Sequence, residues 1–279
     1  MLNPSFDLFN RKSQTVWTNS YAVLAIALIV VSPGTMSVHA DDFHTDMMRA
    51  TVKLRHDSST AAGFVLRQSR PQDQGGTRSV LITAAHVLEK TKGAETTLVY
   101  RVREGEGIYK KQTIPLAIRK DDKPLWTKHS TEDVAVMPVV IPDGADLSEL
   151  SVDALANDDL LRQHKIHPGQ TIACLGYPHK VEANEAGFPI LRIGAIASYP
   201  LIPSMTNKTF LFSANTFEGD SGGPIYHAET GLILGLMHGQ HFLDEEMVLI
   251  YGTSKLRHRL GLGIVVQSAS IRQTLEQLP

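Results

Sequence analysis

Short apolar segments separated by turn-forming residues make up the chain beyond residue 40, and this pattern limits the fold more than any other feature. Gly, Pro, Asn and Asp fill the gaps between the segments, whereas long stretches of helical periodicity are few. This alternation is typical of an all-β protein. The expected strands cover 51–54, 62–66, 79–83, 97–103, 112–119 and 134–140, followed by 171–175, 190–197, 209–213, 223–227, 232–238 and 261–266.

The expected strands fall into two groups, which predict two antiparallel six-stranded β-barrels at about 45–142 and about 168–266. Between the groups, 143–167 is polar and acidic with spaced Leu and Val residues, which indicates a partly helical connector. After the second group, 268–278 starts with a serine and carries apolar residues on one side. That combination predicts a C-terminal α-helix packed on the body of the protein.

The first 40 residues have the layout of a secretory signal peptide. Arg11 and Lys12 precede an apolar run over 21–31, which Ser-Pro-Gly and a Val-His-Ala sequence follow. The run is about half as long as the ~20 residues of a membrane-spanning helix. We therefore expect a signal peptide at 1–40 and an exported domain at 41–279, periplasmic or extracellular, without stable membrane insertion after cleavage. The alternative is an uncleaved anchor, because the segment before the apolar run is long.

Charge and cysteine content narrow the possible partners and crosslinks. The chain has a formal net charge of −2 and no Lys-rich or Arg-rich run, so we expect no nucleic-acid partner. Its single cysteine, Cys174, lies in an apolar segment and excludes an intrachain disulfide. A buried, unreactive thiol is expected at this position.

Two histidine pairs have a spacing that metal ions use, namely His164 with His167 and His238 with His241. Neither pair is accompanied in the sequence by a cysteine or carboxylate cluster. Structural metal sites need further ligands of these types. The sequence therefore predicts no metal ion and no cofactor.

A serine stands between glycines in the sequence G-D-S-G-G-P at 219–224. Glycines on both sides permit a tight turn that exposes the hydroxyl of Ser221. The same turn points the backbone N–H groups of Gly219 and Ser221 at one spot, where they can stabilise a developing oxyanion.

A histidine and an aspartate supply the other groups that a nucleophilic serine needs. His86 ends an apolar strand after two small residues, and Asp133 stands at the start of a β-branched run. Taken alone, such a histidine can be a core residue, and such an aspartate is usually solvated. Together with Ser221 they favour a triad of imidazole, carboxylate and hydroxyl.

Three motifs resemble the chymotrypsin/trypsin family of serine peptidases and follow in that family's order. They are T-A-A-H at 83–86, D-V-A-V at 133–136 and G-D-S-G-G-P at 219–224. A-G-F-V at 62–65 resembles the strand ahead of the family's histidine. The chain lacks an Ile-Val-Gly-Gly start, whose freed amino group would pair with Asp220, and it lacks disulfides. It therefore resembles the cysteine-poor bacterial branch.

The resemblance implies roles for individual residues. His86 would act as general base and acid, Asp133 would orient it, and Ser221 would attack. Gly219 and Ser221 would form the oxyanion hole. The implied activity is that of a serine endopeptidase, which forms an acyl-enzyme and binds a polypeptide substrate as an added β-strand.

Two other functions compete with this interpretation. G-D-S-G-G at 219–223 also fits the G-x-S-x-G elbow of α/β-hydrolases, with Asp244 and His258 following in the order of those esterases. That fold needs a helix directly after the serine, whereas Gly-Gly-Pro-Ile-Tyr reads as a turn into a strand. The second alternative is a catalytically silent protease-fold protein that binds a partner.

The residues around the specificity pocket depart from the trypsin pattern. By the resemblance, Asn215 would stand at the pocket floor, where an uncharged amide cannot neutralise a buried Lys or Arg. Thr216 and His238 together resemble the glutamate-specific bacterial branch, which implies a preference for acidic side chains. An alignment that places Met237 in the pocket would favour an apolar side chain instead.

Overall fold

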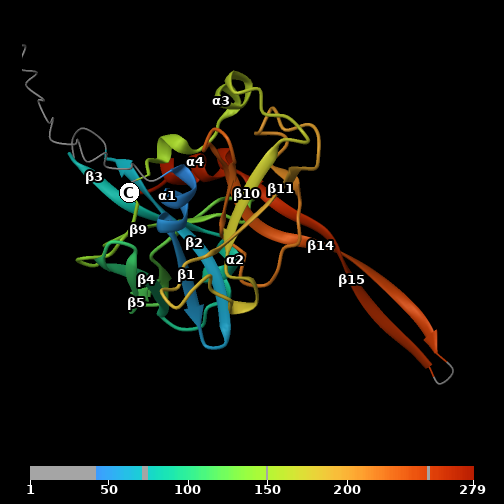
Figure 1. The fold of residues 1–279 in the computed structure, drawn as a ribbon, viewed down its shortest axis with the longest axis horizontal. Coiled ribbons are helices and arrows are strands. Elements are labelled where there is room, and N and C mark those ends of the chain that lie inside the picture. The colour runs from blue at the N-terminus through green and yellow to red at the C-terminus, as the bar shows by residue number, and fades with distance from the viewer. Residues whose placement is uncertain (1–41, 71–74, 149, 250–251) are drawn as a thin grey trace, which may run out of the picture. The chain divides into compact units, whose positions relative to one another are not determined.

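The computed structural model describes residues 42–70, 75–148, 150–249 and 252–279, so the expected signal peptide at 1–40 lies outside the described residues. Six strands close into an antiparallel barrel in the order β10-β11-β12-β15-β14-β13. This confirms the expected second barrel, and Figure 1 shows its strands from yellow to red. Their bounds are β10 Thr171–Gly176, β11 Ile190–Ile196, β12 Thr209–Ser213, β13 Pro224–His227, β14 Ile233–Leu249 and β15 Gly252–Gln267.

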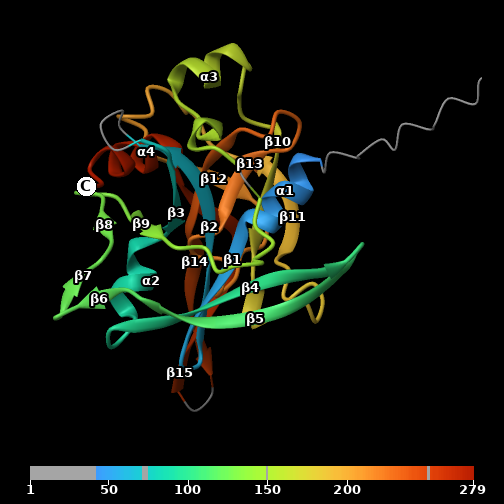
Figure 2. The same cartoon turned by 90° about the vertical axis from the view of Figure 1, so that its left-hand side faces the viewer.

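The N-terminal half forms a seven-stranded antiparallel sheet in the order β5-β4-β1-β2-β3-β9-β8. Among the described residues β5 and β8 are its two ends, so the expected closed six-stranded first barrel is not shown. Figure 2 shows the long β4–β5 pair of this sheet and the small separate β6–β7 pair. The bounds are β1 Thr51–His56, β2 Ser59–Ser69, β3 Thr77–Thr83, β4 Glu95–Gly105, β5 Ile108–Ala117, β6 Arg119–Lys120, β7 Lys123–Pro124, β8 Thr127–Lys128 and β9 Ala135–Val139.

Helices connect and cover the two sheets. The expected C-terminal helix is present as α4, Ser268–Glu276, and the connector holds a 3-10 turn at Val152–Ala154 and α3, Asp158–Gln163. α2 is Ala85–Lys90, and a second 3-10 turn spans Pro178–Lys180. In the described part of the chain, no helix combines the length and hydropathy needed to cross a membrane.

An N-terminal helix, α1 at Phe43–Ala50, was not expected from the sequence. Asp42 caps it by accepting a hydrogen bond from the backbone N of Thr45 at 2.8 Å, which satisfies a donor that the first helical turn leaves unpaired. Arg49 near its end forms a bidentate contact with Asp146, with the shortest N–O distance 2.8 Å. α1 is therefore anchored to the chain that follows the first sheet.

A shared apolar core joins the sheet to the barrel. Phe64 and Ile82 of the sheet lie in the same buried cluster as Leu236 of the barrel and Ile271 of α4. All four are fully buried, and burying such side chains stabilises the packing by about 1.5–3 kcal/mol each. The shared core fixes the N-terminal sheet against the barrel, so that loops from both lie next to each other.

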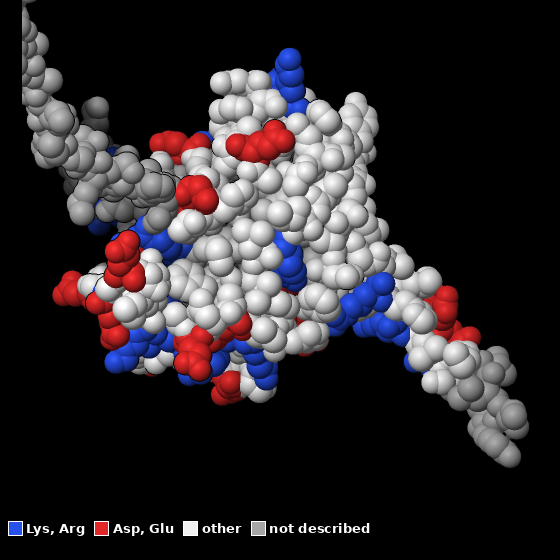
Figure 3. Space-filling model, in the orientation of Figure 1, with Lys and Arg blue, Asp and Glu red and all other residues white. Residues whose placement is uncertain are grey.

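β14 and β15 continue past the barrel as a two-stranded ribbon, which Figure 1 shows extending away from the other strands. The sequence predicted strands only at 232–238 and 261–266. The ribbon strands carry charged side chains, as the ion pair of Arg257 with Asp244 illustrates (2.7 Å between Nε and Oδ1), so the apolar alternation that marks a strand is weak there. On the face shown in Figure 3, acidic and basic side chains are interspersed.

Candidate active site

His86 lies at the start of a helix that directly follows a central strand. β3 ends at Thr83 and α2 begins at Ala85. Ala84 and Ala85 are fully buried. The backbone therefore packs closely at this corner, where larger side chains would not fit. The side chain of His86, 26% exposed, therefore projects from a fixed backbone position.

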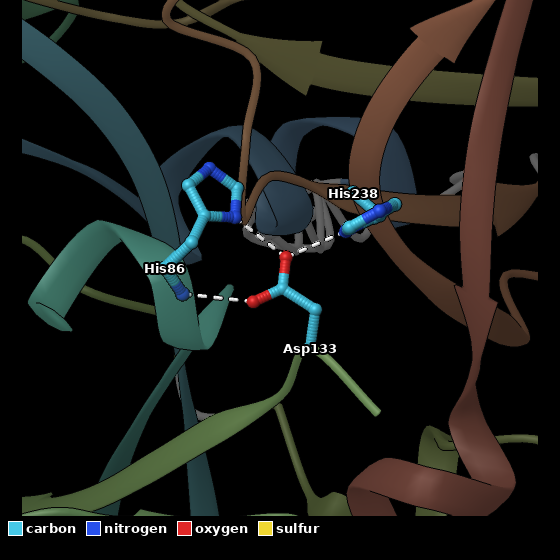
Figure 4. A group of neighbouring side chains, drawn as sticks. All are labelled: His86, Asp133 and His238. Carbon is cyan, nitrogen blue, oxygen red and sulfur yellow. Dashed lines mark hydrogen bonds and ion pairs between the residues drawn. The ribbon is translucent and has the colours of Figure 1, made fainter. Parts of the chain in front are cut away.

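Asp133 approaches His86 because of strand pairing. β9 pairs antiparallel with β3, and Ala135 lies opposite Thr83, so the residues just before β9 pass the start of α2. Asp133 Oδ1 accepts a hydrogen bond from the backbone N of His86 at 2.8 Å. Its Oδ2 lies 2.5 Å from Nδ1 of the His86 ring (Figure 4). These two contacts fix the orientation of the imidazole.

The carboxyl group of Asp133 is held in its ionised form. Burial by itself raises the pKa of Asp133, but hydrogen bonds from His238 and His86 outweigh it and hold the pKa well below the usual 3.8. An ionised Asp133 accepts the Nδ1–H of a neutral His86 ring, which leaves Nε2 as the hydrogen-bond acceptor of that ring.

Ser221 stands in a turn that only glycines allow. Gly219 and Gly222 have φ of 101° and 83°, a region that side-chain-bearing residues rarely adopt. A Cβ on Gly219 would lie 2.1 Å from Tyr177 O, and one on Gly222 would lie 2.1 Å from Thr83 Oγ1. The second contact shows that the turn lies directly against the end of β3, close to His86.

Backbone hydrogen bonds hold the serine turn between the two sheets. Ala62 N in β2 donates to Ser221 O at 2.9 Å, and Gly222 N donates to Met237 O in β14 at 2.7 Å. His86, Gly219 and Ser221 line one cavity of about 810 Å³, together with residues of the β1–β2 hairpin and α2. His86 and Ser221 therefore border the same cavity.

Two of the three expected segments thus line one cavity, and Asp133 of the third segment contacts His86 at its border. Residues 61–236 match the family model described as a trypsin-like peptidase domain. The chain belongs to this family. No curated protein matches the chain.

Solved structures of peptidases are among the structural matches. One is a crystal structure of Rv3671c from M. tuberculosis H37Rv in an inactive form, with 17% identity, 85% of this chain and 90% of that chain covered, and a TM-score of 0.46. A second crystal structure of the Rv3671c protease, also inactive, has 18% identity, coverage of 85% and 92%, and a TM-score of 0.45.

The peptidase domain has an internal counterion for Asp220, which the sequence interpretation missed. Arg192 on β11 donates from Nη1 to Asp220 Oδ2 at 2.7 Å, and its Nη2 lies 2.6 Å from Oδ1. Asp220 is fully buried, and its Oδ2 also accepts from Phe217 N at 2.7 Å. The signal in the sequence was an arginine within the apolar segment 190–197.

Cys174 lies beside this ion pair, at 3.6 Å from Nη2 of Arg192. The cysteine is fully buried, and burial raises the pKa of its thiol to about 12. The expectation of a buried cysteine is confirmed, and the high pKa keeps the group protonated and unreactive.

A strained turn packs against Gly219. His179 and Lys180, both lining the cavity, have φ of 48° and 73°. Such conformations cost energy and persist where surrounding contacts enforce them. Here His179 N donates to Glu218 O at 2.8 Å, and Tyr177 N donates to Gly219 O at 3.2 Å. The turn and the serine loop therefore hold each other in place.

Glu182 anchors this turn through two lysines. Lys53 donates to Glu182 Oε1 at 2.7 Å and to Lys180 O at 3.0 Å, while Lys111 donates to Glu182 Oε2 at 2.6 Å. Burial raises the pKa of Glu182, but the hydrogen bonds from Lys111 and Lys53 outweigh it and lower the pKa below its usual value. The carboxylate therefore stabilises the folded state.

Replacing Glu182 with glutamine should lower the melting temperature at pH 7 by a few degrees. Because the folded-state pKa is depressed, the stabilisation is present above the unfolded pKa and is lost as pH falls through the folded value. The difference in melting temperature between wild type and Glu182→Gln should therefore shrink below about pH 4. Melting curves from pH 7 to pH 3 test this, and a difference that stays constant over that range would contradict it.

The residues expected in the specificity pocket differ in their surroundings. The His238 ring, 41% exposed, places Nδ1 at 2.6 Å from Asp133 Oδ2 (Figure 4). Asn215 is exposed, and its side chain lies near Gly261. Thr216 is buried, and its side chain and that of Met237 both lie near Gly263. His238 is a second partner of the Asp133 carboxylate, and its place in a specificity pocket stays a prediction.

Proposed function

We propose that this chain is an exported serine endopeptidase that hydrolyses peptide bonds through Ser221, His86 and Asp133. The observation that carries the proposal is the pairing of the His86 ring with Asp133 at the edge of a cavity that Ser221 also lines. A neutral imidazole that donates from Nδ1 to a carboxylate presents the lone pair of Nε2, which can take the proton of a serine hydroxyl. The family match supports peptide-bond hydrolysis.

In the proposed reaction, Oγ of Ser221 attacks the substrate carbonyl carbon while Nε2 of His86 takes the hydroxyl proton. His86 then gives this proton to the leaving amine, and an acyl-enzyme remains on Ser221. Water activated by His86 hydrolyses the ester and restores the serine. Asp133, with its depressed pKa, stays ionised and stabilises the positive charge that forms on His86.

The backbone N–H groups of Gly219 and Ser221 are the proposed oxyanion hole. The left-handed conformation of Gly219 and the bond from Tyr177 N to its carbonyl oxygen support a fixed orientation for this turn. The Arg192–Asp220 ion pair also holds this turn in place, because Asp220 lies between Gly219 and Ser221 in the sequence. Preorganised donors of this kind stabilise the charge that develops in the transition state.

We propose that the residue before the scissile bond has an uncharged side chain. A Cβ on Gly263 would lie 2.9 Å from Thr216 Cγ2 and 3.0 Å from Met237 Cε, so these side chains converge on a glycine. Thr216 Oγ1 is buried without a hydrogen-bond partner among the described residues and can bond a neutral polar group. His238, which together with Thr216 implied the acidic preference, is engaged by Asp133. The surroundings therefore favour neutral side chains over acidic ones.

A peptide library cleaved by purified residues 41–279 tests both the activity and this preference. Peptides with Leu, Met or Gln before the scissile bond should show a kcat/KM at least about tenfold above matched peptides with Glu or Lys, since burying an unpaired charge costs more than 1.4 kcal/mol. Faster cleavage after Glu would restore the acidic preference. Cleavage of no peptide would count against the peptidase itself.

Export is proposed from the N-terminal sequence alone, because 1–40 lies outside the described residues. Arg11 and Lys12, the short apolar run and Ala40 together support a cleaved signal peptide. N-terminal sequencing of the protein recovered from its native compartment should give a chain that starts at Asp41. A chain that retains Met1 would support the uncleaved anchor instead.

A further inference from the structure

Two histidines and an aspartate converge at one point of the proposed active site. Nδ1 of His86, Oδ2 of Asp133 and Nδ1 of His238 all lie within 4.8 Å of one another. Figure 4 shows both rings directed at the same carboxylate oxygen, one from α2 and one from β14. The spacing in the sequence suggested a pair of His238 with His241. In the structure the neighbours of His238 are instead His86 and Asp133, from the N-terminal half of the chain.

We propose that these three side chains bind a divalent transition-metal ion of the Zn²⁺ type, and that binding switches the peptidase off. Binding itself depends only on the three ligands, whereas the loss of activity rests on the function proposed above. Two imidazole nitrogens and one carboxylate oxygen form a donor set that Zn²⁺ accepts in sites with three protein ligands and an open fourth position. Hard cations such as Mg²⁺ and Ca²⁺ prefer sets made of oxygen atoms.

The site is accessible and close to the required size. The side chains of His86, Asp133 and His238 are 26%, 16% and 41% exposed, so an ion can enter from solvent. Zinc bonds of about 2.0–2.1 Å in a tetrahedral site separate neighbouring donors by about 3.3 Å. The observed Nδ1–Oδ2 distances are 2.5 Å for His86 and 2.6 Å for His238, so the two rings must withdraw by about 0.8 Å and about 0.7 Å, respectively.

The backbone at His238 allows this adjustment. The register of β14 with β15 shifts between Met237 and Gly239, which places His238 at a β-bulge. Gly239 has no atom of another segment near the position of an added Cβ. The strand can therefore move locally at this position without disrupting the barrel.

Metal binding and catalysis need opposite states of the same nitrogen. In the metal-free protein Nδ1 of His86 donates its hydrogen to Asp133, and Nε2 carries the lone pair. In the metal-bound protein Nδ1 gives its lone pair to the ion, so a neutral ring carries its hydrogen on Nε2. Such a ring cannot take the proton of Ser221. The Oδ2 atom of Asp133, bound to the ion, also no longer accepts from the His86 ring.

Calorimetric titration of Ser221→Ala with ZnCl₂ tests the binding separately from catalysis. This variant keeps all three ligands, so it should bind one Zn²⁺ per chain whether or not Ser221 is the nucleophile. His238→Ser in the same background should weaken binding at least about 100-fold, since even changes behind a metal ligand cost 10–100-fold. His241→Ser is the matched control, because His241 is exposed on the same strand and outside the cluster, and it should bind like its parent.

The inhibition is measured on enzyme that retains Ser221. Zn²⁺ should suppress peptide cleavage by the wild type and by His241→Ser at the concentrations that saturate the calorimetric site, while Mg²⁺ should not. His238→Ser, compared with its own metal-free rate, should resist Zn²⁺ at these concentrations. The proposal is overturned if Ser221→Ala shows no saturable binding, if binding is equally strong without His238, or if saturated wild-type enzyme keeps its full rate.

Discussion

Replacing Ser221 with alanine should lower kcat for a cleavable peptide by a factor on the order of 10⁴ to 10⁶, because the residues of the proposed triad would act as a unit. This corresponds to about 5–8 kcal/mol of lost transition-state stabilisation. The serine turn should keep its shape, since Gly219 and Gly222 and their backbone hydrogen bonds are unchanged. KM should therefore change much less than kcat.

The matched control is Ser59→Ala. Ser59 lines the same cavity as Ser221 and carries the same hydroxyl group, but it is exposed in the β1–β2 hairpin. Its removal should leave kcat near the wild-type value. A serine-directed fluorophosphonate should label wild type and Ser59→Ala and leave Ser221→Ala unlabelled. Undiminished turnover by Ser221→Ala would refute the assignment of the nucleophile.

Replacing Arg192 with methionine should destabilise the fold by about 3–5 kcal/mol, because it leaves the buried carboxylate of Asp220 without its counterion. Methionine has a side chain of similar length to arginine but carries no charge, so the loss of stability reports mainly on the missing charge. Asp220 is fully buried and also holds Phe217 N, so the turn that carries Gly219 and Ser221 should loosen as well. Urea unfolding gives the stability, and kcat gives the effect on the turn.

Arg257→Met provides the comparison on the surface. Arg257 also pairs with an aspartate, Asp244, at 2.7 Å between Nε and Oδ1, but both side chains are more than half exposed. Exposed ion pairs are screened by water and contribute little, so this variant should unfold at nearly the wild-type urea concentration. If Arg192→Met were no less stable than Arg257→Met, Arg192 would not be the required counterion of Asp220. Adding Asp220→Asn to Arg192→Met should recover part of the lost stability, because it removes the unpaired charge.

The Arg192–Asp220 pair also suggests why this chain has no Ile-Val-Gly-Gly start. In relatives that need such a start, a freed amino group neutralises the aspartate before the serine. Here the guanidinium of Arg192, on the barrel strand β11, neutralises Asp220 from within the fold. Neutralisation of Asp220 therefore does not depend on a freed amino group.

The sequence by itself predicted the chemistry of the candidate site and the class of the fold. Ser221 and its flanking glycines follow from a local pattern, because a turn with positive φ needs glycine. His86 and Asp133 were predicted only in combination with that motif. The barrel strands and α4 follow from period, which is a property of neighbouring residues. These features need no knowledge of distant contacts. The expected capping role of Ser268 was wrong, because Gln267 occupies the N-cap position and Ser268 Oγ donates to Ile233 O.

Only the tertiary structure decided which partners the charged groups have. His238 and Asp133 are 105 residues apart, and Arg192 and Asp220 are 28 apart. Their contacts depend on how the sheet and the barrel pack and on the register of β14, neither of which leaves a periodic trace in the sequence. The physical reason is that local conformation is set by adjacent residues, whereas an ion pair or a shared carboxylate is set by the geometry of the assembled core.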